Sequence, residues 1–181
     1  MRKNLPSIII LVVTIALSAW GFMYMQPNSG QARFKADVLT VNAEAAGTWG
    51  AEISQLHSWG VPIEFVTHDE ADITFVIGET PCQEVPGFGK ACVSGEAQQT
   101  MNNRNWVEYC IITLSDRGTN DTREATAVVT HEFGHCLGAR HDDTKDSIMG
   151  TVMPTKAYTP EHWSWTVTDA DRASVAIRYA H

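Results

Sequence analysis

The segment HEFGHCLGARH, residues 131–141, constrains this chain more than any other stretch of its sequence. His131 and His135 are four residues apart, so on a helix they lie about 40° from each other around the axis and can reach one metal ion together. Gly138 can adopt the left-handed conformation that ends a helix, which lets His141 approach the same ion from another side. Three protein ligands leave a tetrahedral Zn2+ one open position for water, as in catalytic rather than structural zinc sites.

Two further features of this region add to the prediction. Glu132 directly follows the first histidine, and its carboxylate can take a proton from a zinc-bound water. Met149 lies eight residues after His141, behind Ser147 and Ile148, and is expected to form an apolar floor under the histidines. A bare pair of histidines at this spacing is usually solvated or structural, but every additional fixed position makes a chance match less plausible. The pattern therefore predicts a peptide-bond hydrolase with one catalytic Zn2+ and Glu132 as its proton acceptor.

Length and charge limit the other possibilities. A chain of 181 residues with 44% hydrophobic residues predicts one folded domain of ordinary size. The net charge of -8 argues against nucleic-acid binding, because the sequence offers no basic stripe to neutralise phosphates. A protein or peptide substrate is the expected partner, and the oligomeric state stays open.

The N-terminal segment predicts export. Arg2 and Lys3 precede an apolar run of about 20 residues, which is long enough to span a bilayer. Positive charge on the N-terminal side predicts that the rest of the chain is translocated, whether or not the segment is cleaved. We therefore expect a signal peptide or signal anchor at residues 1–26, a linker at 27–33 and the peptidase domain at 34–181, outside the cytoplasm. The membrane is then contacted only through an uncleaved apolar segment.

Hydrophobic periodicity predicts a mixture of short strands and helices. Strands are expected at residues 34–41, 62–66, 71–77, 91–95 (an edge strand) and 108–114, and helices at 45–56, 122–137 and 166–181. Asn42 can cap the first helix, and Asp121 or Thr122 the second. Thr168 can cap the third helix, whose positive first turn then contains Asp171.

Four cysteines in an exported chain predict two disulfides: Cys82, Cys92, Cys110 and Cys136. A helix that returns after a strand runs roughly antiparallel to it, so the helix end at Cys136 is expected near the strand start at Cys110. Cys82 and Cys92 would then close a small loop. Two alternatives stay open: a loop cysteine that ligates zinc as an inhibitor, or four free cysteines.

With these residues in place, the chain resembles the metzincin zinc peptidases. The step from His141 to Met149, the strand that begins Ala71-Asp72-Ile73 and the C-terminal TDADRASVAIRYA are similar to the matrixin branch, the catalytic-domain type of matrix metalloproteinases. The resemblance covers roughly residues 34–181. It implies an α+β metzincin fold, in which a twisted mixed β-sheet packs on the active-site helix and a small C-terminal subdomain with a final helix follows the third histidine. It also implies a zinc endopeptidase that cleaves extracellular proteins or peptides, with the substrate added to the edge strand.

Some residues depart from the matrixin pattern. Asp142 after the third histidine is more like the reprolysin branch, so the branch stays open. Only His57 and His68 precede the motif, and both are expected at the surface rather than in a second zinc site. Calcium is possible, but no spacing of oxygen ligands specifies it. The alternative to an enzyme is an exported zinc-binding interaction module without significant turnover, although such a module would not need Glu132.

Overall fold

The computed structural model describes residues 33–85, 89–104, 106–119, 121–144, 146–151 and 162–179. The segment predicted to direct export, residues 1–26, lies outside these ranges. Within them, no helix has both the length and the apolar character needed to cross a membrane.

The centre of the fold is a six-stranded mixed sheet. Its strands are β1 (Arg33–Phe34), β2 (Leu39–Asn42), β3 (Ile63–Phe65), β4 (Ile73–Gly78), β7 (Gly95–Met101) and β8 (Trp106–Ser115). The order is β1-β8-β4-β2-β3 with parallel neighbours, and β7 pairs antiparallel with β8. A separate antiparallel hairpin consists of β5 (Cys82–Val85) and β6 (Gly89–Cys92).

One face of the sheet forms the core. On β8, Cys110, Ile112 and Leu114 are buried, whereas Tyr109 and Ile111 on the other face are exposed. This alternation follows from the two-residue period of a strand, and it determines which face receives the central helix.

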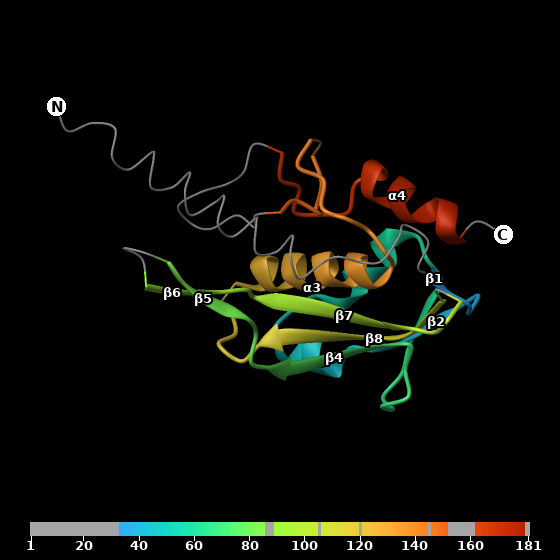
Figure 1. Ribbon diagram of the computed structural model, residues 1–181, viewed down its shortest axis with the longest axis horizontal. Helices are drawn as coiled ribbons and strands as arrows, with labels where there is room; N and C mark the ends of the chain where they lie inside the picture. The colour runs from blue at the N-terminus through green and yellow to red at the C-terminus, as the bar shows by residue number, and fades with distance from the viewer. Residues whose placement is uncertain are drawn as a thin grey trace.

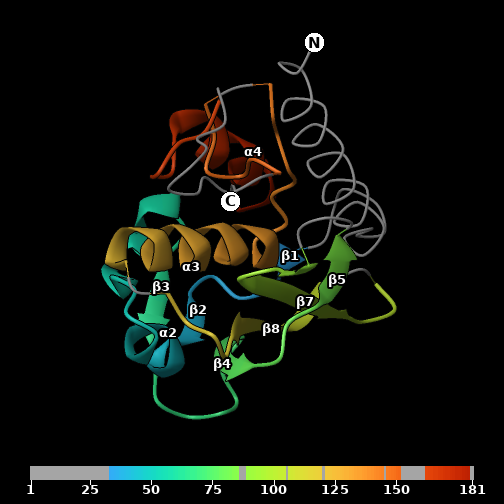
Figure 2. The same ribbon diagram turned by 90° about the vertical axis from the view of Figure 1, so that its left-hand side faces the viewer.

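The helix that covers this face is α3 (Thr122–Cys136). Asp121 caps it, since its side chain accepts hydrogen bonds from the backbone N–H groups of Arg123 and Glu124. A second long helix, α4 (Asp169–Tyr179), lies on the side of α3 away from the sheet (Figure 1, Figure 2). The predicted α+β fold, with a twisted sheet packed on the active-site helix and a final helix after the histidines, is confirmed.

Three predicted elements were wrong in detail. The single strand at 34–41 is two strands, because β1 ends at Phe34 and pairs with β8, whereas β2 begins at Leu39 and pairs with β3 and β4. The single helix at 45–56 is two short elements, α2 (Glu44–Thr48) and the 3-10 helix η1 (Ile53–Trp59), because Gly50 between them has a left-handed φ of 98°. The edge strand is β7, at Gly95–Met101, rather than residues 91–95. Residues 91 and 92 instead end β6, where they pair with β5.

Candidate metal centre

Three histidines meet at the C-terminal end of α3. His131 and His135 project from its last turns, and the helix ends directly after them at Cys136. Gly138 has a φ of 87°, which allows the chain to reverse, and this reversal returns His141 to the helix. The histidines predicted to be ligands are therefore brought together in space.

The spacing of the three imidazoles fits one tetrahedral zinc ion. The Nε2 atom of His135 lies 3.1 Å from that of His131 and 3.2 Å from that of His141, and the third separation is 3.3 Å. Three nitrogens held at about 2.0–2.1 Å from one tetrahedral zinc lie roughly 3.3–3.4 Å apart. The donor set of three imidazoles also suits this metal.

The other ring nitrogens fix the tautomers of two histidines. His131 Nδ1 donates to the carbonyl oxygen of Ile148 at 2.7 Å, and His135 Nδ1 donates to that of Ala139 at 3.0 Å. A neutral imidazole carries one N–H, so the Nε2 atoms of these two histidines turn lone pairs toward the centre. Facing lone pairs repel each other unless a cation lies between them.

The surroundings keep the histidines neutral. Burial, reinforced by the charge of His141, lowers the pKa of His131 to about 3. Burial and the two neighbouring histidines lower the pKa of His135 well below its usual value, and burial lowers that of His141. Neutral imidazole is the form that binds a metal ion, so these residues are ready to bind across the neutral pH range.

Glu132 lies beside this cluster with one oxygen unpaired. Its side chain is 4% exposed, and Oε2 has no hydrogen-bond partner. Burial, together with the charge of Glu96, raises the pKa of Glu132 to about 8, against a hydrogen bond from the Ala97 backbone that lowers it. A Cβ atom at Gly95 would lie 2.8 Å from Glu132 Cγ, so the glycine at the start of β7 makes room for this carboxyl group.

Met149 packs under the same end of α3. It is fully buried, and a Cβ atom at Gly134 would lie 2.7 Å from its sulfur and 2.4 Å from the Trp59 ring. The ring of Trp163 stacks on that of His131, with centroids 6.3 Å apart. The missing side chain at position 134 therefore lets the turn at residues 147–149, here called the methionine turn, approach the helix closely.

Other residues of the centre were missed by sequence reasoning. Gln99 on β7 donates its Nε2–H groups to the carbonyl oxygens of His135 (2.7 Å) and Cys136 (3.0 Å) at the end of α3, where the His135 oxygen also accepts the backbone N–H of Gly138 at 2.8 Å. Asp171 is buried and bonded to Ser147, although its sequence position suggested only a charge in the first turn of a helix. The spacing of Thr168 and Asp171 is a capping-box signal, but no local pattern indicates burial against a distant turn.

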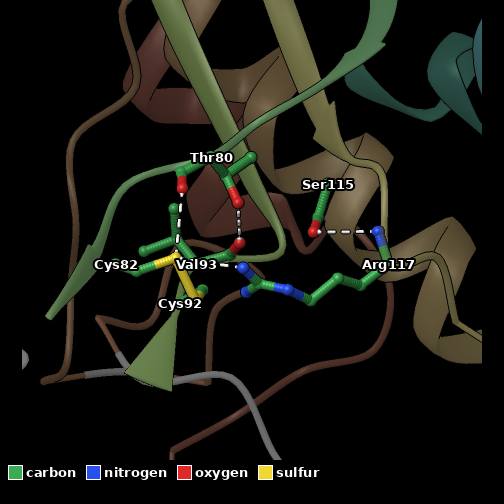
Figure 3. Close-up of a disulfide and its surroundings, with 6 residues drawn as sticks. All are labelled: Thr80, Cys82, Cys92, Val93, Ser115 and Arg117. Atoms are coloured by element: carbon green, nitrogen blue, oxygen red, sulfur yellow. Dashed lines mark hydrogen bonds between the residues drawn. A yellow bond between two sulfur atoms is a disulfide. The ribbon is translucent and has the colours of Figure 1, made fainter. Parts of the chain in front are cut away.

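Both predicted disulfides are present. Cys110 on β8 is bonded to Cys136 at the end of α3, and Cys82 is bonded to Cys92 across the β5–β6 hairpin. Figure 3 shows the hairpin disulfide beside Arg117, whose guanidinium donates to Cys82 Sγ at 3.3 Å. Since no described cysteine is free, a cysteine ligand to the metal centre is not available among them.

Comparison with known families agrees with this geometry. The model of the reprolysin-like metallopeptidases of family M12B matches residues 24–175, which is most of the chain. No curated protein matches the sequence. The family match supports the predicted metzincin assignment but does not extend to the matrixin subtype.

Proposed function

The chain belongs to the reprolysin-like metallopeptidases of family M12B, and we propose that His131, His135 and His141 hold its catalytic zinc ion while Glu132 transfers the proton. The observation that carries this proposal is the convergence of three Nε2 atoms within 3.1 to 3.3 Å of one another. Two of the rings already use Nδ1 for backbone carbonyls, so little reorganisation is needed to accept an ion.

Each residue then has a defined task. When bound, zinc supplies Lewis-acid chemistry, which polarises the scissile carbonyl and lowers the pKa of water. Glu132 Oε2, buried and without a partner, accepts a proton from the attacking water and returns it to the leaving amine nitrogen. Gly95 leaves free the space that this carboxyl group occupies.

We expect an extended peptide to pair with β7. Among the described strands, β7 has only β8 as a neighbour, so its other edge can donate and accept backbone hydrogen bonds. Gly95 at its first position lies against Glu132, so a peptide on this edge passes the proposed proton acceptor. Cleavage within an extended chain makes the enzyme an endopeptidase.

The test compares hydrolysis of a denatured protein by the full chain and by its Glu132→Gln variant. Wild-type activity should disappear with a chelator and return with Zn2+, and Glu132→Gln should lower kcat by about 100-fold or more because general-base catalysis is lost. Glu124→Gln, eight residues earlier on the same helix, is the matched control and should keep wild-type activity. Internal fragments in the digest would identify an endopeptidase.

The same experiment distinguishes the alternative of a zinc-binding interaction module. Such a module would bind Zn2+ but hydrolyse the substrate no faster than Glu132→Gln does. Equal, chelator-insensitive rates for all variants would overturn the peptidase proposal.

We also propose that the chain is exported, with residues 1–26 as signal or anchor and 34–181 as the peptidase domain. Of the linker predicted at 27–33, Arg33 belongs to β1 and so to the domain. Two disulfides support an oxidising compartment. Mass spectrometry of the mature N-terminus tests whether the apolar segment is removed. Within the metzincins, the family match and Asp142 both favour the reprolysin-like branch over the matrixin-like subtype that the step from His141 to Met149 suggested.

A further inference from the structure

Asp171 is a buried carboxylate that the chemistry above does not use. It is 4% exposed and receives four hydrogen bonds. Thr168 gives two, from its backbone N–H and from its hydroxyl group, both 2.8 Å from Oδ2. The other two come from the methionine turn: Ser147 Oγ donates to Oδ1, and the N–H of Ile148 donates to Oδ2 at 3.3 Å.

Only half of this set is explained by helix capping. Thr168 and Asp171 form a reciprocal cap, since the Asp171 N–H also donates to Thr168 Oγ1 at 3.2 Å. The bonds from Ser147 and Ile148 belong to a segment more than twenty residues earlier and add nothing to the cap. The carboxylate therefore has a second function on the methionine turn.

The bonds from the turn continue to a metal ligand. His131 Nδ1–H donates to Ile148 O at 2.7 Å, and this oxygen shares one peptide unit with the N–H of Met149. That N–H donates to Ser147 Oγ at 2.9 Å, and Ser147 Oγ–H donates to Asp171 Oδ1. These bonds form one continuous chain, which runs from His131 through the 148–149 peptide and Ser147 to Asp171. Every donor in it points toward the carboxylate.

We propose that Asp171 is a positioning residue for the metal centre, which orients and polarises the His131 imidazole through Ser147 and the peptide between Ile148 and Met149. The proposal rests on the zinc site proposed above. Aligned hydrogen bonds strengthen one another, and a negative charge at the accepting end makes Ile148 O a better acceptor for His131 Nδ1–H. A ligating histidine held in this way keeps its tautomer and binds metal more strongly.

His135 provides a comparison within the same centre. Its Nδ1–H donates to Ala139 O at 3.0 Å, a carbonyl beyond the end of α3 that is not part of the chain to Asp171. The two histidines share a helix and a tautomer, and His131 is buried whereas His135 is half-buried. They differ in one further respect: the carbonyl that accepts from His131 is linked by hydrogen bonds to Asp171, and the carbonyl that accepts from His135 is not part of that chain.

Two variants distinguish the two functions of Asp171, which are positioning of His131 and capping of α4. Ser147→Ala removes the hydroxyl group that links the turn to Asp171 and leaves the Thr168 bonds in place. Thr168→Val is the matched control, because it removes a hydroxyl donor from the same carboxylate and leaves the chain to His131 intact. Both substitutions should lower the melting temperature, Ser147→Ala by leaving the Met149 N–H unpaired and Thr168→Val by removing the cap.

The experiment measures Zn2+ affinity of the full-length variants by competition with a chromophoric chelator, and the visible spectrum of the Co2+ forms. Ser147→Ala should weaken Zn2+ binding about 10-fold or more and shift the Co2+ bands, as loss of a partner behind a ligand does. Thr168→Val should stay within about 2-fold of wild type with unchanged bands. Equal losses in both variants, or no loss in Ser147→Ala, would overturn the proposal.

A second measurement uses the wild-type chain alone and so does not depend on the folding of a variant. In the proton NMR spectrum of the Zn2+ form, the Nδ1–H of His131 should resonate downfield of that of His135 and exchange more slowly with water. Coincident shifts and exchange rates would contradict polarisation by Asp171. A wild-type chain that binds no Zn2+ would overturn the metal site itself, whereas a Zn2+-binding, active wild type with an unaffected Ser147→Ala overturns only the role of Asp171.

Discussion

Among single residues, Glu132 is a carboxyl group whose buried position opposes its charged form. Burial and the neighbouring Glu96 raise its pKa to about 8, so the metal-free folded protein holds a proton that an unfolded chain releases above its ordinary pKa of 4.5. The folded state thus binds more protons than the unfolded state between these two values, and stability contributed by this group falls as the pH rises through that window.

We predict that Glu132→Gln removes this pH dependence. The quantity to compare is the free energy of unfolding of the variant minus that of wild type, measured in the presence of a chelator. This difference should grow as the pH rises from 4.5 toward 8, by at most about 1.4 kcal/mol per pH unit, and should level off above pH 8. Denaturant titrations of both proteins at several pH values measure this difference in the free energy of unfolding. The histidine contributions are present in both proteins and cancel, so parallel profiles would contradict the raised pKa.

The residues of the site differ in how far the sequence could predict them. The three histidines and Glu132 were predictable because helical geometry alone relates residues four apart, and Gly138 ends the helix locally. Asp171 was not, since its partner Ser147 lies 24 residues away and the contact depends on how α4 docks. Gly95 was missed for the same reason: only the packed structure shows that a side chain there would strike Glu132.

Among the elements, α3 is held at both ends. Asp121 caps its start, and Gln99 binds the carbonyl groups at its finish. The disulfide between Cys110 and Cys136 ties the same end to β8, one residue after the proposed ligand His135. Fixing the helix end in this way also fixes the direction of the His135 side chain.

The two disulfides should therefore differ in their effects. Replacing Cys110 and Cys136 by alanine should cost roughly 3–4 kcal/mol of stability, because the 26-residue link is lost. It should also weaken Zn2+ binding, because the helix end that carries the proposed ligand His135 is released. Replacing Cys82 and Cys92 should cost roughly 2–3 kcal/mol, since only a 10-residue link is lost. The Zn2+ affinity of this second double variant should match that of wild type.

Denaturant unfolding and chelator competition on both double variants check this prediction. Equal Zn2+ affinities in the two would show that the helix end is held without the bond to β8.

The boundaries of helices and strands were harder to predict from the sequence than their presence. The strands near 63–65, 73–78 and 106–115 were predicted because apolar runs bounded by turn residues extend over several positions. The apolar spacing from 45 to 56 fits one helix, but Gly50 turns the chain in the middle, and glycine is compatible with either outcome. Whether residues 91–95 or 95–101 form the edge could be decided only by the pairing with β8.

At the scale of the whole molecule, the proposed metal ion would add a link between two parts of the chain that already pack against each other. Two of its proposed ligands lie on α3 and the third lies in the segment that leads to the methionine turn and α4. A ligand that binds only the folded state stabilises it by mass action, by about 2.7 kcal/mol at a concentration 100 times its Kd.

We therefore predict that a chelator lowers the melting temperature of the full chain and that added Zn2+ restores it. His141→Ala should abolish the restoration, since two ligands remain, whereas His162→Ala should retain it because this exposed histidine pairs with Asp146 outside the cluster. Differential scanning calorimetry measures all three proteins. An unchanged melting temperature on chelation, or full restoration in His141→Ala, would contradict the proposed ligand set.

The bond between Ser147 and Asp171 also determines when, during synthesis of the chain, the methionine turn can be held in place. A ribosome delivers the three histidines and the methionine turn before it delivers α4, so a growing chain contains every residue of the motif before it contains the carboxylate that holds the turn. The centre is consequently finished only when the C-terminal helix docks. The proposed metal ligands are therefore fully supported only after α4 has been synthesised and has docked on the turn.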